Sequence, residues 1–361
     1  MNNLDQLFPG LSNSVYLNTP AMGLIPQNVY NYKKDILDLH LQHPTRYFEN
    51  YDSQLNQVTN YLKRLLRVKN GNIAFTPNFS FGFHGVLSGI SPNSKIMFIE
   101  NDYPSITLAV KKWDFQFREI ALKADIEETI FKAFKKEQPD VFIFSVIQYL
   151  NGLKLNASFI KNLKQIFPQT LFIADGTQFC GTESFNFEES GIDILGVSAY
   201  KWLHAGWGSA FFVFRKGLEM RVQPKTIGSN AVDKESALQA IPLHKKLEPG
   251  HLDLMQLGSL APALETLFEI GEEKIYKKIE QISRTAKTAF AELNLLENQI
   301  IKQSTSSPIF NLQIDTRNLA YLNNQNIICA QRGQGIRVGF HYYNSIQDLS
   351  YLLKALKNLP Y

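Results

Sequence analysis

An acidic and a basic residue each follow an apolar run in the middle of the chain. Asp175 follows the run Thr170-Leu-Phe-Ile-Ala, and Lys201 follows the run that begins at Ile192. If both runs are strands of one parallel sheet, the two side chains lie at its carboxyl edge, where open α/β sheets bind ligands. Pyridoxal phosphate requires a lysine for its Schiff base and an anion that keeps its pyridine nitrogen protonated. The pair therefore predicts a pyridoxal phosphate site, although each residue alone is also typical of a surface lysine or of an Asp-Gly turn.

A second segment has the features of a phosphate-binding turn. An apolar run ends near Phe75, and Pro77 precedes a helical pattern that starts near Phe79. Free backbone amides and the helix dipole favour an anion at such a helix start, whereas a simple N-cap is the alternative. The polar side chains that can add contacts to a phosphate are Thr76, Asn78 and Ser80, with Ser198 and Tyr200 beside the lysine.

Two further residues are expected at the same edge of the sheet. Tyr103 comes after the apolar run 95–99, where an aromatic ring can stack on the cofactor ring. Gln178 lies three residues after Asp175 and can hydrogen-bond the ring hydroxyl oxygen, although a surface amide fits this spacing nearly as well.

Short apolar runs alternate with amphipathic segments between residues 71 and 215. This pattern predicts an α/β fold with a mostly parallel sheet that helices cover on both faces. The last run comes too soon after Gly206 for a crossover helix, so a mixed sheet is expected. The predicted strands are 72–76, 95–99, 140–145, 170–174, 192–198 and 209–214, and the predicted helices include 126–136 and 158–166.

The pattern changes after the last of these strands. Residues 222–253 contain Pro, Gly and His, and residues 254–296 are strongly helical. We predict a large domain over 15–235 and a small α+β domain over 236–361, on which residues 1–14 pack. The small domain should contain strands within 308–314, 326–329 and 335–339 and a helix over 346–356. Loops within 20–50 and 222–253 are expected to set substrate specificity.

The composition limits the class of protein. The chain has 361 residues, of which 44% are hydrophobic, and a net charge of +4 without a run of like charges, so no nucleic-acid partner is expected. No apolar stretch reaches the roughly 18 residues that span a bilayer, and the start of the chain lacks signal-peptide features. Cys180 and Cys329 have no metal-ligand spacing, which argues against a zinc site or a disulfide framework. These features predict a cytoplasmic protein without a membrane partner.

The chain resembles the class V aminotransferase superfamily of fold-type I pyridoxal phosphate enzymes, which includes cysteine desulfurases, kynureninases and isopenicillin N epimerase-like proteins. The most specific similarities are Ala-Asp-Gly-Thr-Gln at 174–178 and Ser-Ala-Tyr-Lys-Trp at 198–202. Weaker ones run from Tyr16-Leu-Asn-Thr-Pro to Gly335-Ile-Arg-Val-Gly. The resemblance implies a large domain with a mixed sheet of about seven strands, a small C-terminal domain, and a homodimer with shared active sites.

The resemblance also implies roles for single residues. Lys201 would form the Schiff base, Asp175 would pair with the pyridine nitrogen, and Gln178 would contact the ring hydroxyl. Arg337 would hold the α-carboxylate of an amino-acid substrate, for which its bidentate fork is suited; a surface arginine on an edge strand is the alternative. His251 is either a phosphate ligand or a loop histidine. The residues predicted to bind the cofactor, some of them from the partner subunit, are Asn78, Phe79, Ser80, Tyr103, Ser198, Tyr200, Ser229, Asn230 and His251.

The type of reaction is decided after Lys201 has removed the Cα proton of the substrate. Tyr200 stands where desulfurases have a histidine, and Tyr-Lys-Trp-Leu is closer to kynureninases. Cys329 lies eight residues before Arg337 in an apolar run, so it is predicted to be a core thiol and not a persulfide carrier. We therefore predict an aminotransferase that acts on an amino acid. A lyase of the kynureninase or cysteine-desulfurase type is the alternative, and a non-catalytic regulator with the same fold is another.

Overall fold

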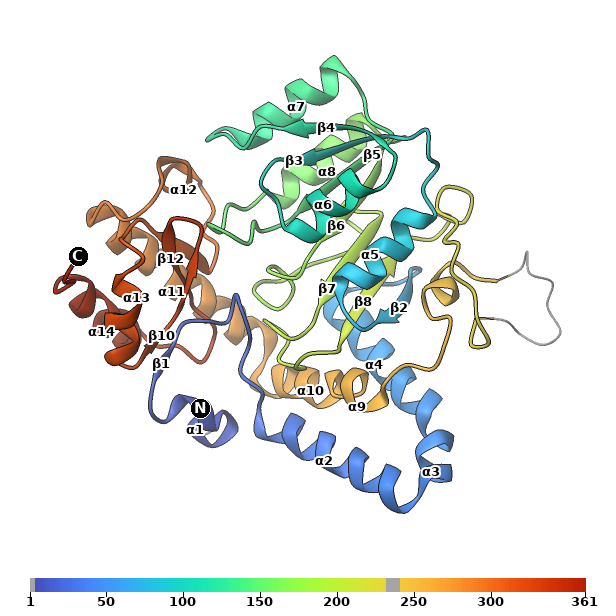
Figure 1. The fold of residues 1–361 in the computed structure, drawn as a ribbon, viewed down its shortest axis with the longest axis horizontal. Helices are drawn as coiled ribbons and strands as arrows, with labels where there is room; N and C mark the ends of the chain where they lie inside the picture. The colour runs from blue at the N-terminus through green and yellow to red at the C-terminus, as the bar shows by residue number, and fades with distance from the viewer. Residues whose placement is uncertain (1–3, 232–240) are drawn as a thin grey trace.

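A seven-stranded sheet lies at the centre of the structure, a computed structural model that describes residues 4–231 and 241–361 (Figure 1). The strand order is β2-β8-β7-β6-β5-β3-β4. The strands are β2 (Asn72–Thr76), β3 (Lys95–Ile99), β4 (Gln116–Ile120), β5 (Val141–Ser145), β6 (Leu171–Asp175), β7 (Ile194–Ser198) and β8 (Ala210–Phe214).

The sheet is mixed, as predicted. Strands β3 to β7 are all parallel to one another. Strand β8 is antiparallel to both of its neighbours, β7 and β2. Gly206 and Gly208 have φ of +78° and +89° in the turn before β8, a region that glycine enters without steric cost. Every predicted strand of this sheet is present within two residues. The strand β4 was not predicted, because its sequence Gln-Phe-Arg-Glu-Ile is mostly polar and lacks the continuous apolar run that marks the other strands.

Helices cover both faces of this sheet. Neighbouring residues of β5 belong to two different core clusters, with Phe142 and Phe144 in one and Val141 and Ile143 in the other. The first cluster also contains residues of α4 (Tyr51–Leu66), α7 (Ile126–Lys136) and α8 (Ala157–Ile166), and the second contains residues of α5 (Phe79–Ser88) and α6 (Pro104–Lys112). The strands are therefore buried on both faces, which explains their continuous apolar runs.

The segment 20–50, expected to be mainly loop, is mostly helical. It contains α2 (Gln27–Gln42) and α3 (Pro44–Glu49), and Val29 and Ile36 of α2 are buried at helical spacing. The apolar face of α2 is narrow, so the sequence pattern is weak. The helical region 254–296 is divided into α9 (Leu254–Leu257), α10 (Leu260–Ile270) and α11 (Glu272–Glu292), with Gly271 between the last two.

The C-terminal part contains a smaller antiparallel sheet of order β11-β12-β9. The predicted boundary at residue 235 lies outside the described residues, so the division into domains stays a prediction. Near the N-terminus, β1 pairs in parallel with β10, which brings Val15 beside Ile327. The remaining elements are α1 (Leu4–Leu7), η1 (Pro9–Leu11), β1 (Val15–Tyr16), η3 (His244–Leu247), α12 (Asn298–Lys302), β9 (Ile309–Leu312), α13 (Asn318–Asn324), β10 (Ile327–Ile328), β11 (Ala330–Arg332), β12 (Gly335–Gly339) and α14 (Ile346–Leu356).

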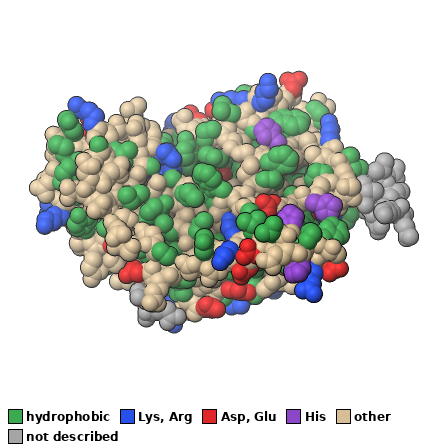
Figure 2. Space-filling view, turned by 60° about the horizontal axis from the view of Figure 1, so that its bottom comes forward, with side chains coloured by type: hydrophobic (Ala, Val, Ile, Leu, Met, Phe, Trp, Pro, Cys, Tyr) green, Lys and Arg blue, Asp and Glu red, His purple; other side chains and the backbone are tan. Residues whose placement is uncertain are grey.

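The surface in Figure 2 carries charged side chains of both signs, interspersed with hydrophobic ones. A mixed distribution of this kind produces no extended field of one sign on this face. Within residues 4–231 and 241–361, no helix is long and apolar enough to cross a membrane.

Candidate active site

A cavity of about 80 Å³ lies at the carboxyl ends of β5, β6 and β7, beside the start of α5. It is the place where an α/β sheet offers a ligand site. Residues that are more than a hundred positions apart in the sequence meet there. The lining residues are Asn78, Phe79, Ser80, Tyr103, Ser145, Ile147, Tyr149, Asp175, Thr177, Gln178, Ser198, Tyr200 and Lys201, and nine of them were predicted from the sequence.

Lys201 and Asp175 are both buried, at 6% relative exposure, and both line this cavity. Asp175 is the last residue of β6, and its Oδ1 accepts a hydrogen bond from the backbone nitrogen of Thr177 at 2.8 Å. Lys201 comes after β7, and its Nζ lies 5.8 Å from the ring centroid of Tyr103 and 5.5 Å from that of Tyr200. An amine, a carboxylate and two aromatic rings thus share one small enclosed space.

Burial changes the charges of this pair. Desolvation, with the positive charges of Arg337 and Arg332, lowers the pKa of Lys201 to about 7, although Asp175 opposes the shift. Desolvation also raises the pKa of Asp175 to about 6, against the hydrogen bonds from Thr177 and the charge of Lys201. At neutral pH a large fraction of Lys201 is the neutral amine, the form that reacts with a carbonyl group. Asp175 remains mostly ionised and can pair with a protonated ring nitrogen.

The predicted helix start is present, and its polar residues form local hydrogen bonds. Asn78 is the N-cap of α5, because its Oδ1 accepts from the backbone nitrogen of Phe81 at 2.9 Å. Phe79 donates its backbone N–H to Oγ of Ser198 at 3.0 Å, and Ser80 shares a hydrogen bond with Ser105 at 2.6 Å. These contacts place three polar residues at the end of the cavity where a phosphate was predicted.

Gln178 is held in one orientation by two contacts. Its Nε2 donates to the carbonyl of Pro20 at 2.9 Å, and its Oε1 accepts from Nε1 of Trp202 at 2.8 Å. Trp202 directly follows Lys201 and is 1% exposed. The second N–H of the Gln178 amide has no partner among the described residues, and Gln178 lines the cavity.

Arg337 lies on β12, beyond the lining of the cavity itself, and is 2% exposed. Its Nη1 donates to the carbonyl of Tyr149 at 2.6 Å, and Tyr149 lines the cavity. Its Nε has no hydrogen-bond partner among the described residues. Burial and the charge of Arg332 lower the pKa of Arg337 to about 9, so it remains a cation at neutral pH. A buried cation with an unused donor fits a carboxylate ligand.

Three of the residues predicted to bind the cofactor do not belong to this cavity. Ser229 is exposed, and Asn230 is half-buried with its Nδ2 directed to the carbonyl of Glu248 at 3.3 Å. His251 is exposed, and its ring lies 5.8 Å from that of Phe48. Within one chain these residues are placed away from the cofactor cavity, so a role in a partner's site stays a prediction.

Other residues of the site were missed by sequence reasoning. Asp102 is buried, accepts from the backbone N–H of Tyr103 at 2.7 Å, and is bonded to Ser145 on the neighbouring strand β5. Gly23 donates its backbone N–H to the carbonyl of Tyr200 at 3.0 Å, and a Cβ there would lie 1.9 Å from the carbonyl oxygen of Lys201. For Asp102 the only sequence signal was an acid directly before Tyr103. For Gly23 no local signal exists.

The residues present fit pyridoxal phosphate. A buried amine of lowered pKa, a buried carboxylate and a ring that can stack lie together, as its aldehyde, pyridine nitrogen and ring require. The hydroxyls of Ser80 and Ser198 lie at the start of α5, where the helix dipole favours a phosphate. Lys201 would hold the aldehyde, Asp175 the ring nitrogen and Tyr103 the ring face.

Comparisons with known sequences identify relatives that extend over nearly the whole chain. The family model Aminotransferase class-V matches residues 15–352. A probable cysteine desulfurase of Ureaplasma parvum serovar 3 is 24% identical over an alignment of 402 positions, which covers 99% of this chain and 97% of that relative. The uncharacterized aminotransferase YcbU of Bacillus subtilis is 22% identical and is covered to 96%, with 97% of this chain aligned.

Solved structures have the same fold. A mutant of C-DES with glycine covalently linked to its PLP cofactor superposes with a TM-score of 0.88 at 18% identity, covering 98% of this chain and 99% of that one. The apo cysteine desulfurase of Thermococcus onnurineus NA1 gives a TM-score of 0.84 at 16% identity, with 98% and 96% coverage. These matches confirm the predicted α/β fold.

The family match and the PLP-bound structure of the same fold together confirm the prediction of pyridoxal phosphate as the cofactor. They agree with the amine, carboxylate and aromatic ring that the cavity brings together. The chain belongs to the class-V aminotransferase family of PLP-dependent enzymes.

Proposed function

We propose that the protein is a PLP-dependent lyase that cleaves the carbon–sulfur bond of a cysteine-type amino acid and releases the sulfur in a small molecule. This is the alternative to the aminotransferase expected from the sequence. Support comes from the relatives named probable cysteine desulfurase and from the similarity to C-DES, a cystine C-S lyase solved with its product cysteine persulfide.

The state of the two cysteines decides between release of the sulfur and its transfer to the protein. The chain has only Cys180 and Cys329, and both are free thiols that are buried, at 2% and 7% exposure. Burial raises the pKa of Cys329 to about 12 and raises the pKa of Cys180 as well. A sulfur-accepting thiol must be an accessible thiolate. Neither residue meets this requirement, so sulfur would leave on the substrate fragment and not on the protein.

The side chains supply positioning and proton transfer. Arg337 would bind the substrate α-carboxylate through the unused donor of its guanidinium and so orient the Cα–H bond. The neutral amine of Lys201 would accept the Cα proton, because its pKa lies near neutrality. The bound cofactor supplies an electron sink for the electron pair left on Cα. As the Cβ–S bond breaks, Lys201 would return its proton to the departing sulfur, which leaves as hydrogen sulfide from L-cysteine or as cysteine persulfide from L-cystine. The remaining three-carbon fragment would be hydrolysed to pyruvate and ammonia.

A second arginine favours a substrate with another anionic group. Arg332 on β11 is half-buried, and its charge contributes to the lowered pKa values of Lys201 and Arg337. The same charge opposes the burial that raises the pKa of Tyr200 to about 12. Cystine has a carboxylate at each end, and one guanidinium is available for each. We expect Arg332→Gln to raise KM for L-cystine about tenfold and to leave KM for L-cysteine within twofold.

The test measures products from the holoenzyme with L-cystine and L-cysteine. We expect pyruvate together with persulfide or sulfide, and no accumulation of pyridoxamine phosphate. The double variant Cys180→Ala/Cys329→Ala should keep this rate within threefold, whereas Lys201→Ala should lose it by at least a thousandfold. Loss of sulfur release in the cysteine double variant, with the fold retained by circular dichroism, would overturn the proposal in favour of a protein-bound persulfide.

Aminotransferase activity is the second candidate. Two relatives, YcbU and a Schizosaccharomyces pombe protein, are named uncharacterized aminotransferases. The same residues would serve: Arg337 would hold the α-carboxylate, Lys201 would move the Cα proton, and the cofactor would accept the amino group. Formation of pyridoxamine phosphate and a 2-oxo acid from a panel of amino acids, without pyruvate from L-cystine, would favour this activity.

We further propose a homodimer whose active sites are shared between subunits. Leu37, Leu41 and Phe48 on α2 and α3 are exposed at 58%, 80% and 64%, and such apolar side chains favour an interface. The dimer would supply Ser229, Asn230 or His251 to the partner's phosphate. Analytical ultracentrifugation should give twice the chain mass, and His251→Ala should weaken cofactor retention; a monomer that retains the cofactor would contradict the shared site.

A further inference from the structure

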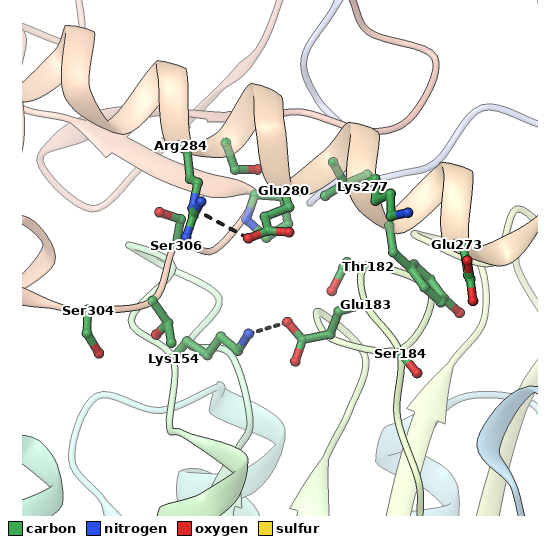
Figure 3. Close-up of a pocket in the computed structure, with 15 residues that line it drawn as sticks. Lys154, Thr182, Glu183, Ser184, Glu273, Lys277, Glu280, Arg284, Ser304 and Ser306 are labelled. Carbon is green, nitrogen blue, oxygen red and sulfur yellow. Dashed lines mark hydrogen bonds and ion pairs between the residues drawn. The ribbon is translucent and has the colours of Figure 1, made fainter.

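A larger cavity of about 450 Å³ lies apart from the cofactor site and shares no lining residue with it. One wall comes from the segments after β5 and β6, and the opposite wall comes from α11 and residues 304–308. Figure 3 shows Lys154 and Glu183 on one side and Glu280 and Arg284 of α11 on the other. The volume is within the range of cavities that bind small molecules.

Two hydroxyl groups in this cavity lack partners. Ser283 is 1% exposed, and its Oγ has no hydrogen-bond partner among the described residues. Oγ1 of Thr305 is also buried, and it too has no hydrogen-bond partner among the described residues. Both residues line the cavity. Buried hydroxyls are nearly always hydrogen-bonded, so these two favour a ligand that supplies a hydrogen-bond partner.

The charges of the lining are balanced and placed on both walls. Lys154 is paired with Glu183, and its side chain is only 9% exposed. Arg284 is paired with Glu280 at 3.4 Å across one turn of α11, where both side chains remain more than half exposed. The complete lining has three cations, Lys154, Lys277 and Arg284, and three carboxylates, Glu183, Glu273 and Glu280. A simple anion or cation would therefore meet no net opposite charge.

We propose that this cavity binds a free α-amino acid as its zwitterion. The ammonium group would lie between the carboxylates of Glu183 and Glu280, and the carboxylate would accept hydrogen bonds from Ser283 and from Arg284. Tyr276 and Ile279 provide an apolar surface for a small aliphatic side chain. The inference does not depend on the reaction proposed above, because no active-site residue takes part.

The test uses holoenzyme whose active site has been closed by aminooxyacetate, a carbonyl-reactive compound, with the excess removed by dialysis. Equilibrium dialysis with labelled L-valine should then show one molecule bound per chain. L-valinamide, which lacks the carboxylate, and 2-hydroxyisovalerate, which lacks the ammonium group, should compete at least tenfold more weakly than unlabelled L-valine. Equal competition by either analogue would overturn the assignment of a zwitterion site.

Substitutions in the lining test whether L-valine binds in this cavity. Ser283→Leu fills it, and Glu280→Gln removes one ammonium partner; each should weaken L-valine binding at least tenfold. Glu280 is largely exposed, so its variant should fold even if the buried substitution does not. Glu292→Gln is the matched control, because it lies on the same helix outside this lining and should leave binding within twofold. No binding to the blocked wild type, or binding that both cavity variants retain, would reject the proposal.

Discussion

The carboxylate of Asp102 accepts two hydrogen bonds from Ser145, one from the backbone nitrogen at 2.8 Å and one from the hydroxyl at 2.5 Å. The same carboxylate accepts from the backbone N–H of Tyr103 at 2.7 Å. Burial raises the pKa of Asp102, while these three donors favour its ionised form. Asp102 therefore joins the ends of β3 and β5 and fixes the aromatic residue beside Lys201.

We expect Asp102→Asn to loosen this arrangement. An amide nitrogen cannot accept a hydrogen bond, so at least one buried donor loses its partner, at a cost of about 1–3 kcal/mol. Urea unfolding should show this loss, and the cofactor should dissociate faster because Tyr103 is less well fixed. Asp114→Asn, an exposed substitution in the segment after α6, is the control. Unchanged stability and unchanged cofactor dissociation in Asp102→Asn would refute this role.

Covalent capture of the cofactor should depend on pH through Lys201. Only the neutral amine reacts, and burial lowers the pKa of Lys201 to about 7, so the capture rate should rise with pH and level off above about 8. Stopped-flow absorbance of apoprotein mixed with pyridoxal phosphate measures this rate. Arg337→Gln removes a charge that lowers this pKa and should move the midpoint upward. A midpoint near 10, typical of an exposed lysine, would contradict the argument.

The close contact between Gly23 and the turn at Lys201 can be tested by adding one methyl group. Gly23→Ala would place Cβ 1.9 Å from the carbonyl oxygen of Lys201, so the two backbone segments must separate. Overpacking of this kind costs about 1–3 kcal/mol. Thermal unfolding and cofactor retention should both fall. Gly250→Ala, where the added Cβ meets nothing within 4 Å, should be close to wild type in stability.

The buried histidine His204 should make the protein sensitive to acid. It is 0% exposed, and burial lowers its pKa to about 4. The unfolded chain binds a proton at this residue below about 6.5, so stability falls as pH decreases from about 6.5 to 4, by on the order of 3 kcal/mol. Urea unfolding across this range measures the slope.

The control for this prediction uses two variants. His204→Asn should reduce the slope, and asparagine suits the φ of 60° at this position. His251→Asn, at an exposed histidine, should leave the slope as in the wild type. An equal slope in all three proteins would show that His204 is not the group responsible.

Much of the fold was predictable because its signals are local. Continuous apolar runs marked every inner strand of the sheet, and amphipathic spacing gave the bounds of α7 and α14. The strand β4 and the helix α2 were missed, because their exposed faces are polar and their buried faces narrow. Local pattern determines an element only when burial imposes a clear periodicity on it.

The sequence by itself determined the chemistry available at the site: an amine and a carboxylate that end two strands, with an aromatic residue after a third. These side chains meet in one cavity because the parallel strands that carry them end at the same edge of the sheet. Only the tertiary structure decided the protonation of Lys201 and Asp175, because desolvation depends on every group that packs around them. It also brought Asp102 and Gly23 against the residues of the site, because contacts between distant segments exist only in the folded chain.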